Sequence, residues 1–203
     1  MHGRESDRNM RYDEFFSTSL GRKILEEEAK YIAGNFDGKA VSIGCGTGII
    51  ERKAMDISNV EIIGVEIDDN MIEMARKRID IIKANAENLP FKKLSFDAAI
   101  FITSLEFIDE YKKAINEAHR ILKENGKIIA ILLNTSSTYF KKRYKEGGYI
   151  RKNIKHLNVE KIEEYMSKKF FIKKEGLFRI ENEDLIKPGN SVYGITGVKK
   201  LGQ

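Results

Sequence analysis

From about Gly38 onward, short apolar runs alternate with longer amphipathic stretches. Five apolar runs predict strands, because each is short and bounded by glycine or polar residues: 39–43, 61–65, 81–84, 96–102 and 127–133. The stretches between them predict helices over 48–56, 69–78 and 110–123, with Asn125-Gly126 expected to end the last one. Strands alternating with helices in this way predict a parallel sheet covered by helices on both faces.

The pattern changes on both sides of this α/β core. Residues 12–34 predict a helical N-terminal extension, and the polar, lysine-rich residues 134–165 predict a loop followed by helices. Residues 170–172 and 192–198 return to strand-like spacing. The flanking segments are therefore expected at the mouth of the sheet.

Composition places the chain among single-domain globular proteins. It has 203 residues, 41% of them hydrophobic, which suffices for a sizeable core. Cys45 is the single cysteine, which excludes a disulfide framework and a thiol-rich zinc or arsenic site. The polar start does not fit a secretory signal, and no apolar run reaches the ~18 residues of a membrane span, so a cytoplasmic protein is expected. Abundant isoleucine and lysine with 2 prolines are typical of a thermophile.

The net charge of +5 comes from one segment. Residues 141–175 contain 12 Lys/Arg and 5 Asp/Glu, a balance of +7, which leaves −2 for the rest of the chain. Such a segment fits an anionic substrate or a nucleic acid, or forms the solvated faces of ordinary helices.

Three glycines follow the first predicted strand directly, at Gly44, Gly46 and Gly48. Without Cβ atoms, this turn lets a ligand lie against the backbone at the start of a helix. A dinucleotide-binding loop would need a third glycine at position 49, which is Ile49, and this disfavours a nicotinamide-dependent oxidoreductase.

Glu66 ends the second predicted strand, 18 residues past Gly48. A carboxylate at this place can accept hydrogen bonds from both ribose hydroxyls of a nucleoside ligand. The glycine turn and Glu66 together predict a nucleoside-containing cofactor.

These residues resemble class I S-adenosylmethionine-dependent methyltransferases, and within them the small-molecule branch of ubiquinone/menaquinone-biosynthesis (type 11) methyltransferases. Five segments match the family's motifs in order: Ile43–Gly48, Gly64–Asp68, Asn85–Phe91, Ser95–Ile100 and Glu117–Lys127. The resemblance covers 12–134 well and the last 70 residues loosely.

The resemblance implies a Rossmann-like, doubly wound and mostly parallel seven-stranded sheet with helices on both faces. It implies one methyltransferase domain over 1–203, with an N-terminal helical lid at 10–35, a cofactor-binding core at 38–133, and substrate-side and C-terminal elements at 134–203. The implied cofactor is S-adenosylmethionine, which leaves as S-adenosylhomocysteine, and the implied acceptor is a small molecule.

Two positions depart from the family pattern. An acidic residue usually stands two before the first glycine, where this chain has Ser42, and an aspartate usually follows the third strand, where it has Asn85. Both side chains can still form hydrogen bonds. Both remove negative charge that faces a cationic cofactor, so a lower affinity is expected.

The resemblance also implies site residues. Tyr12 is expected to cover the sulfonium, where an aromatic ring suits a positive centre, or else to pack its helix on the domain. The full set of expected cofactor contacts is Tyr12, Gly44, Cys45, Gly46, Gly48, Glu66, Ile67, Met71, Asn85, Ala86, Glu87 and Thr103. The candidate acceptor contacts are Phe16, Glu106, Asn134 and Tyr139.

Methyl transfer from a sulfonium is a direct displacement, so the protein mainly aligns the reactants and excludes water. Where the acceptor arrives protonated, Glu106 is the first candidate general base and Tyr139 the second. His119 is expected to be structural, and no metal-ligand spacing is present.

Two alternatives stay open at this point. One is an RNA-directed methyltransferase that uses the basic segment 141–175, although the Asn/Asp-Pro-Pro-aromatic signature of amino-group nucleic-acid methyltransferases is absent. The other is a protein that binds S-adenosylmethionine without catalysis. No membrane insertion is expected, and the oligomeric state is open.

Overall fold

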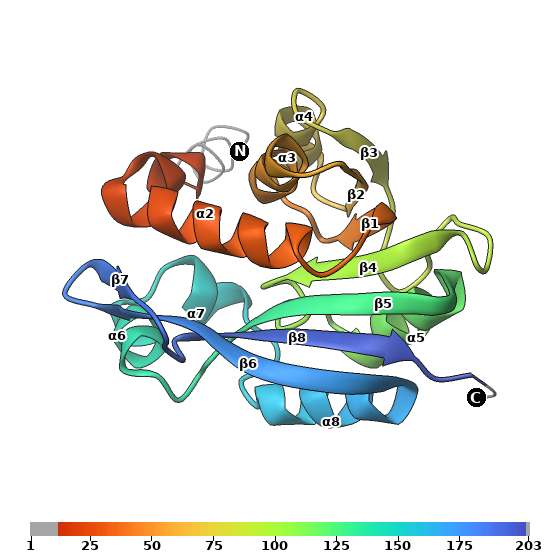
Figure 1. Cartoon of the computed structure of the whole chain (residues 1–203). Coiled ribbons are helices and arrows are strands. Elements are labelled where there is room, and N and C mark those ends of the chain that lie inside the picture. Colours follow the sequence, from red (N-terminus) through yellow and green to blue (C-terminus); the bar gives the residue numbers. More distant parts are fainter. Residues whose placement is uncertain (1–11, 202–203) are drawn as a thin grey trace.

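A computed structural model describes residues 12–201. Its centre is an eight-stranded sheet in the order β3-β2-β1-β4-β5-β8-β6-β7 (Figure 1). Figure 1 shows α2, α3 and α4 above this sheet and α5 and α8 below it, with α6 and α7 beside one end of the strands. The expected α/β fold with helices on both faces is confirmed.

Five strands form the parallel part: β1 (Gly38–Ile43), β2 (Val60–Glu66), β3 (Asp80–Lys83), β4 (Phe96–Ile102) and β5 (Leu122–Leu133). The antiparallel part is β6 (Phe170–Glu181), β7 (Asp184–Ile186) and β8 (Val192–Lys199). The strand order reverses direction at β1, so the carboxyl ends of β1 and β4 flank a topological switch point, where open α/β sheets bind ligands.

The helices are α2 (Ser19–Ala33), α3 (Ile49–Ile57), α4 (Asp69–Ala75), α5 (Tyr111–Ile121), α6 (Thr138–Glu146), α7 (Tyr149–Asn153) and α8 (Val159–Lys169). A short helical segment over 12–17 precedes α2. The Thr18 side chain begins α2 by accepting a hydrogen bond from the Gly21 N–H, as an N-cap residue does. Residues 10 and 11 of the expected lid lie outside the described residues.

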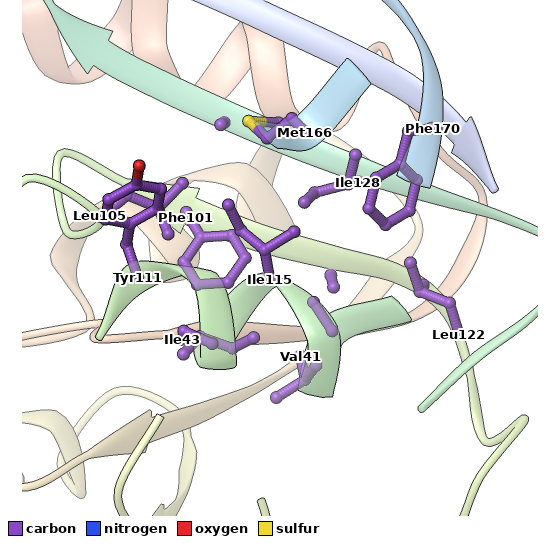
Figure 2. Close-up of a cluster of buried hydrophobic side chains, with 14 of the residues drawn as sticks. Val41, Ile43, Phe101, Leu105, Tyr111, Ile115, Leu122, Ile128, Met166 and Phe170 are labelled. Atoms are coloured by element: carbon purple, nitrogen blue, oxygen red, sulfur yellow. The ribbon is translucent and has the colours of Figure 1, made fainter. Parts of the chain in front are cut away.

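Two apolar clusters hold the layers together. One joins the sheet to α5 and α8, and Figure 2 shows Phe101, Ile115, Ile128, Met166 and Phe170 among its members. The other packs α2 and α3 on the opposite face through Ile24, Ile32, Ile50 and Ile100, among others. In the central strand β4, residues 98–102 are apolar and buried because helices cover both faces of the sheet.

The structure corrects three details. The sheet has eight strands rather than seven, because the short strand β7 forms an antiparallel hairpin with β6. Helix α4 ends at Ala75 rather than at residue 78. Asn125-Gly126 does not end a helix: α5 stops at Ile121, and β5 begins at Leu122, which is buried and pairs with Phe96. Burial of Leu122 in the sheet outweighs the local turn signal.

Candidate functional site

The glycine turn after β1 adopts a conformation that only glycine takes readily. Gly44, Gly46 and Gly48 all have positive φ, at 73°, 56° and 69°. A Cβ at Gly44 would lie 2.9 Å from the Ser104 Cβ, and one at Gly48 would lie 2.8 Å from the Ile79 Cδ1. A Cβ at Gly46 would have no atom within 4 Å, so Gly46 leaves room for a ligand against the backbone.

The Glu66 carboxylate is held at the end of β2 by three backbone N–H groups. Gly46 donates to its Oε2 at 2.9 Å, and Ile67 and Asp68 donate to its Oε1 at 2.7 and 3.1 Å. Oε2 accepts one of these bonds and keeps capacity for a further donor, whereas Oε1 already accepts two. The structure therefore brings Glu66 and the glycine turn together and fixes the orientation of the carboxylate.

The N-terminal helical segment is tied to the glycine turn through Asp13. Its Oδ1 accepts a hydrogen bond from the Thr47 hydroxyl at 2.8 Å, and its Oδ2 pairs with the Arg78 guanidinium. Arg78 also donates to the Thr47 carbonyl at 2.9 Å. Tyr12 is the first described residue of this anchored segment. Its ring lies edge-on against the Phe16 ring, with the ring centroids 5.2 Å apart. Asp13 and Arg78 carry no motif, so sequence analysis missed them.

Ser42 does not leave the turn without an acidic partner. Its hydroxyl donates to the Oε1 of Glu51, on α3, at 2.7 Å, and both residues are buried. The second oxygen of Glu51 is buried without a partner. Burial raises the pKa of Glu51 to about 7. A carboxyl group from the next helix therefore lies beside Ser42, which stands where the family usually has an acidic residue. This compensation becomes visible only in the tertiary structure.

Glu28, on α2, is a second buried acid on the same side of the sheet. It is 5% exposed, and no ion pair or hydrogen bond to another described residue reaches its carboxyl group. Burial, with a smaller contribution from Glu51, raises the pKa of Glu28 to about 8. The phenols of Tyr12 and Tyr139 lie within electrostatic reach of it.

The end of β4 forms the other side of the site. Thr103 has a φ of 43°, which is strained for a β-branched residue, and its N–H donates to the Ile131 carbonyl at 2.8 Å. The Ser104 hydroxyl donates to the Ile43 carbonyl at 2.8 Å and so joins the ends of β4 and β1. These bonds hold the loop after β4 beside the glycine turn.

Glu106, the first candidate base, is fully buried at the ends of β4 and β5. Its Oε1 accepts the Leu133 N–H at 2.7 Å, and its Oε2 has no partner. Its backbone carbonyl accepts from the N–H groups of Lys155 and His156. Burial raises the pKa of Glu106 to about 7, a value suited to exchanging a proton. The same contacts give it a structural role in joining β5 to the loop before α8.

Several expected cofactor contacts point elsewhere. The Cys45 side chain packs inward against Ala75 and Ile79, so only its backbone is available to a ligand. Burial raises the pKa of the Cys45 thiol well above its usual value. The Glu87 carboxylate accepts the Glu110 N–H at the start of α5.

Other expected contacts lie on the surface around Glu66. The Oδ1 of Asn85 accepts the Glu87 N–H in a local turn, and the residue is exposed. Ile67 is 61% exposed, and Met71 is half-buried in the first turn of α4. Ala86 packs at the edge of the core beneath α5.

The candidate acceptor contacts divide in the same way. Phe16 is buried in the core, so its ring packs the N-terminal segment onto the domain. The Asn134 side chain donates to the Asn190 carbonyl and accepts the Ser136 N–H, which orders the loop after β5. Tyr139, at the start of α6, is half-buried. Burial raises the pKa of its phenol, with a smaller contribution from the charge of Glu28.

The two described histidines, His119 and His156, contact backbone carbonyl groups. The Nε2 of His119 is 3.1 Å from the Lys200 carbonyl oxygen, and its ring packs edge-on against Phe170, as its expected structural role requires. The Nε2 of His156 is 2.8 Å from the Ile108 carbonyl oxygen. Between residues 12 and 201, no group of three or more His, Cys, Asp or Glu side chains could hold a metal ion.

Two surface hollows lie away from this site. One is lined by Phe36, Asp97, Lys123 and neighbours where β1 and β4 begin, and another lies at Phe171 and Lys199. Because open α/β sheets bind ligands at the carboxyl ends of their strands, the glycine turn is the better candidate. Within the described part of the chain, no helix is long and apolar enough to cross a membrane.

Comparisons with known proteins agree with this geometry. Residues 41–130 match the methyltransferase domain family of type 11. A Thermotoga maritima S-adenosylmethionine-dependent methyltransferase, described as a possible histamine N-methyltransferase, superposes with a TM-score of 0.79 at 27% identity. This match covers 96% of this chain and 98% of the other.

This chain belongs to the class I S-adenosylmethionine-dependent methyltransferases. An uncharacterized protein of Methanocaldococcus jannaschii is 38% identical over 150 residues, which are 72% of this chain and 69% of that protein. A ubiquinone/menaquinone biosynthesis C-methyltransferase of Citrifermentans bemidjiense is 30% identical over 139 residues, 62% of this chain and 59% of the relative. The cofactor of this methyltransferase is S-adenosylmethionine, and the residues around the glycine turn fit it: Gly46 offers an open backbone and Glu66 an oriented carboxylate.

Proposed function

We propose that this methyltransferase transfers the methyl group of S-adenosylmethionine to a small-molecule acceptor. The observation that carries the proposal is the anchoring of the N-terminal segment beside the glycine turn by Asp13, Thr47 and Arg78. We expect this anchored segment to cover the cofactor site, which favours an acceptor small enough to enter beneath it.

The proposed cofactor contacts follow the geometry of the turn. Glu66 accepts the ribose hydroxyls, and the backbone of the glycine turn lies against the methionine part. Asn85 and Ala86 border the adenine, and Tyr12 covers the sulfur. The open space at Gly46 and the fixed carboxylate of Glu66 support these roles.

When bound, the cofactor supplies a methyl group on a positively charged sulfur. The residues of the chain hold and align the reactants and keep water away from them. The strained Thr103 and the Ser104–Ile43 bond keep the end of β4 rigid beside the turn. Where the acceptor must lose a proton, Glu106 is the candidate to receive it, because its free oxygen and raised pKa permit this.

The relatives support a small acceptor. One is named a ubiquinone/menaquinone biosynthesis C-methyltransferase and another a possible histamine N-methyltransferase, and both named acceptors are small molecules. The basic segment 141–175 argues less for RNA than its charge suggests, because α6 and α7 lie beside the strand ends whereas α8 lies under the sheet (Figure 1). Lys168 and Lys174, in this segment, also pair with Glu164 and Glu163.

The test is methyl transfer from radiolabelled S-adenosylmethionine to a panel of acceptors: hydroquinones, phenols, primary and tertiary amines, and total tRNA and rRNA. Label in a small molecule, with none in RNA, is the expected result. Label in RNA alone overturns the proposal. Tight cofactor binding without transfer to any acceptor favours a binding protein.

A further inference from the structure

Glu28 and Glu51 are buried acids from two different helices, and neither has a cationic partner among residues 12–201. Glu28 is 5% exposed on α2, and Glu51 is 1% exposed on α3. One oxygen of Glu51 is bonded to Ser42, beside the glycine turn, and the other has no partner. The carboxyl group of Glu28 has no hydrogen bond or ion pair with any described residue.

Among residues 12–201, the groups in electrostatic contact with this pair are acids, phenols, a hydroxyl and a thiol. Glu28 is in electrostatic contact with Glu51, and with Tyr12 and Tyr139 from the N-terminal segment and α6. Around Glu51 lie Ser42, Tyr12, Cys45 and Glu66. Arg78 binds next to the glycine turn, but its guanidinium already pairs with Asp13 and donates to the Thr47 carbonyl.

Burying two carboxyl groups without a cationic partner is costly for a fold. Helices α2 and α3 otherwise contribute apolar side chains to one cluster, among them Ile24, Ile32, Ile50 and Ala54. A ligand that brings positive charge to the glycine turn removes this cost, since it pairs with the ionised carboxylates. The position beside Ser42 places the pair at the expected methionine end of the cofactor.

We propose that Glu28 and Glu51 form a subsite for the positive charge of S-adenosylmethionine, so that the protein binds this cationic cofactor in preference to its uncharged-sulfur product. The proposal depends on S-adenosylmethionine being the cofactor and is independent of which acceptor is methylated. Methyl transfer converts the sulfonium to a neutral sulfide, which removes the sulfur's attraction for the pair and favours release of S-adenosylhomocysteine.

The test compares affinities for ligands that differ at this charge. Titration calorimetry at pH 7.5 measures the Kd of S-adenosylmethionine, of S-adenosylhomocysteine and of sinefungin, whose amine replaces the sulfonium with another cation. Glu28→Gln keeps the shape and removes the charge. Glu26→Gln is the matched control, because Glu26 is a half-buried glutamate of the same helix that pairs with Lys30 and Lys53.

For Glu28→Gln, the Kd of both cationic ligands should rise by about tenfold or more, with that of S-adenosylhomocysteine changing by less than about twofold. Glu26→Gln should change none of the three. Equal weakening of all three ligands, or no weakening of any, overturns the proposal. Wild-type protein that binds none of them overturns the assigned cofactor instead, so the two failures are distinguishable.

Proton release on cofactor binding gives a second test, because its amount would not depend on the ligand's charge if Glu28 and Glu51 were only structural. Burial raises the pKa of Glu28 to about 8 and that of Glu51 to about 7, so the free protein carries protons here at neutral pH. Binding a cation should expel them, which calorimetry in buffers of different ionisation enthalpy detects. The release at pH 7 should be larger for S-adenosylmethionine than for S-adenosylhomocysteine and should shrink in Glu28→Gln. Equal release with both ligands contradicts the proposal.

Discussion

Gly46 offers the sharpest separation between a residue needed for binding and one needed for folding. All three glycines of the turn have positive φ, but a Cβ at Gly46 meets no atom within 4 Å, whereas one at Gly48 lies 2.8 Å from the Ile79 Cδ1. Alanine at Gly46 should therefore disturb the ligand and leave the packing intact, and alanine at Gly48 should disturb the packing.

The magnitudes follow from these contacts. The left-handed conformation costs alanine about 1–2 kcal/mol, offset by about 0.4–1 kcal/mol because alanine lowers the entropy of the unfolded chain. Gly46→Ala should thus lose about 1 kcal/mol of unfolding free energy, or about 2–4 °C in Tm for a chain of this length. Gly48→Ala adds the cost of overpacking against Ile79, about 1–3 kcal/mol, so its Tm should fall at least about twice as far.

Binding should reverse this order of severity. The new Cβ at Gly46 occupies the space against which the cofactor is proposed to lie, so its Kd should rise by at least about tenfold, or 1.4 kcal/mol. Calorimetric titration with S-adenosylmethionine, well below each variant's Tm, measures this. Gly147→Ala tests the effect of backbone strain alone: its surroundings in the loop after α6 are open, and its φ of 86° and ψ of −150° lie in a region essentially restricted to glycine. Wild-type affinity in Gly46→Ala would refute the placement of the cofactor on this turn.

Three further outcomes are expected. Glu66→Ala should weaken cofactor binding by about 1–3 kcal/mol, the range for hydrogen bonds to a charged group, and unchanged affinity in calorimetry contradicts the ribose role. Asp13→Asn should loosen the N-terminal segment, seen as faster amide exchange over 12–17 and a higher Kd, and unchanged exchange argues against the anchor. The unfolding free energy of the ligand-free protein should fall as pH rises from about 5 to about 8, by up to about 1.4 kcal/mol per unit and bound proton, because Glu28 and Glu51 hold protons in the folded state that the unfolded chain has released. Denaturant titrations across this range check the slope, which Glu28→Gln should reduce; a slope of opposite sign refutes the burial argument.

The local pattern was enough to predict the parallel core and the glycine turn. Strands covered on both faces are mostly apolar, and a ligand that lies against the backbone favours glycine, so both features are visible along the chain. The family resemblance added the cofactor and the order of the motifs. The end of α5 was predicted wrongly, because Asn125-Gly126 is a strong local turn signal and the burial of Leu122 in the sheet is not a local property.

The charge of the site was decided by the tertiary structure alone. Ser42 and Asn85 suggested lost negative charge, yet Glu51 bonds to Ser42 from α3, and Glu28 joins it from α2. Neither glutamate belongs to a motif, and on an amphipathic helix a buried glutamate looks like any other until its neighbours are known. The sequence by itself therefore determined the fold and the class of cofactor, since these depend on patterns along the chain. Which side chains meet at the cofactor depends on how α2 and α3 pack over the sheet, and only the folded chain brings them together.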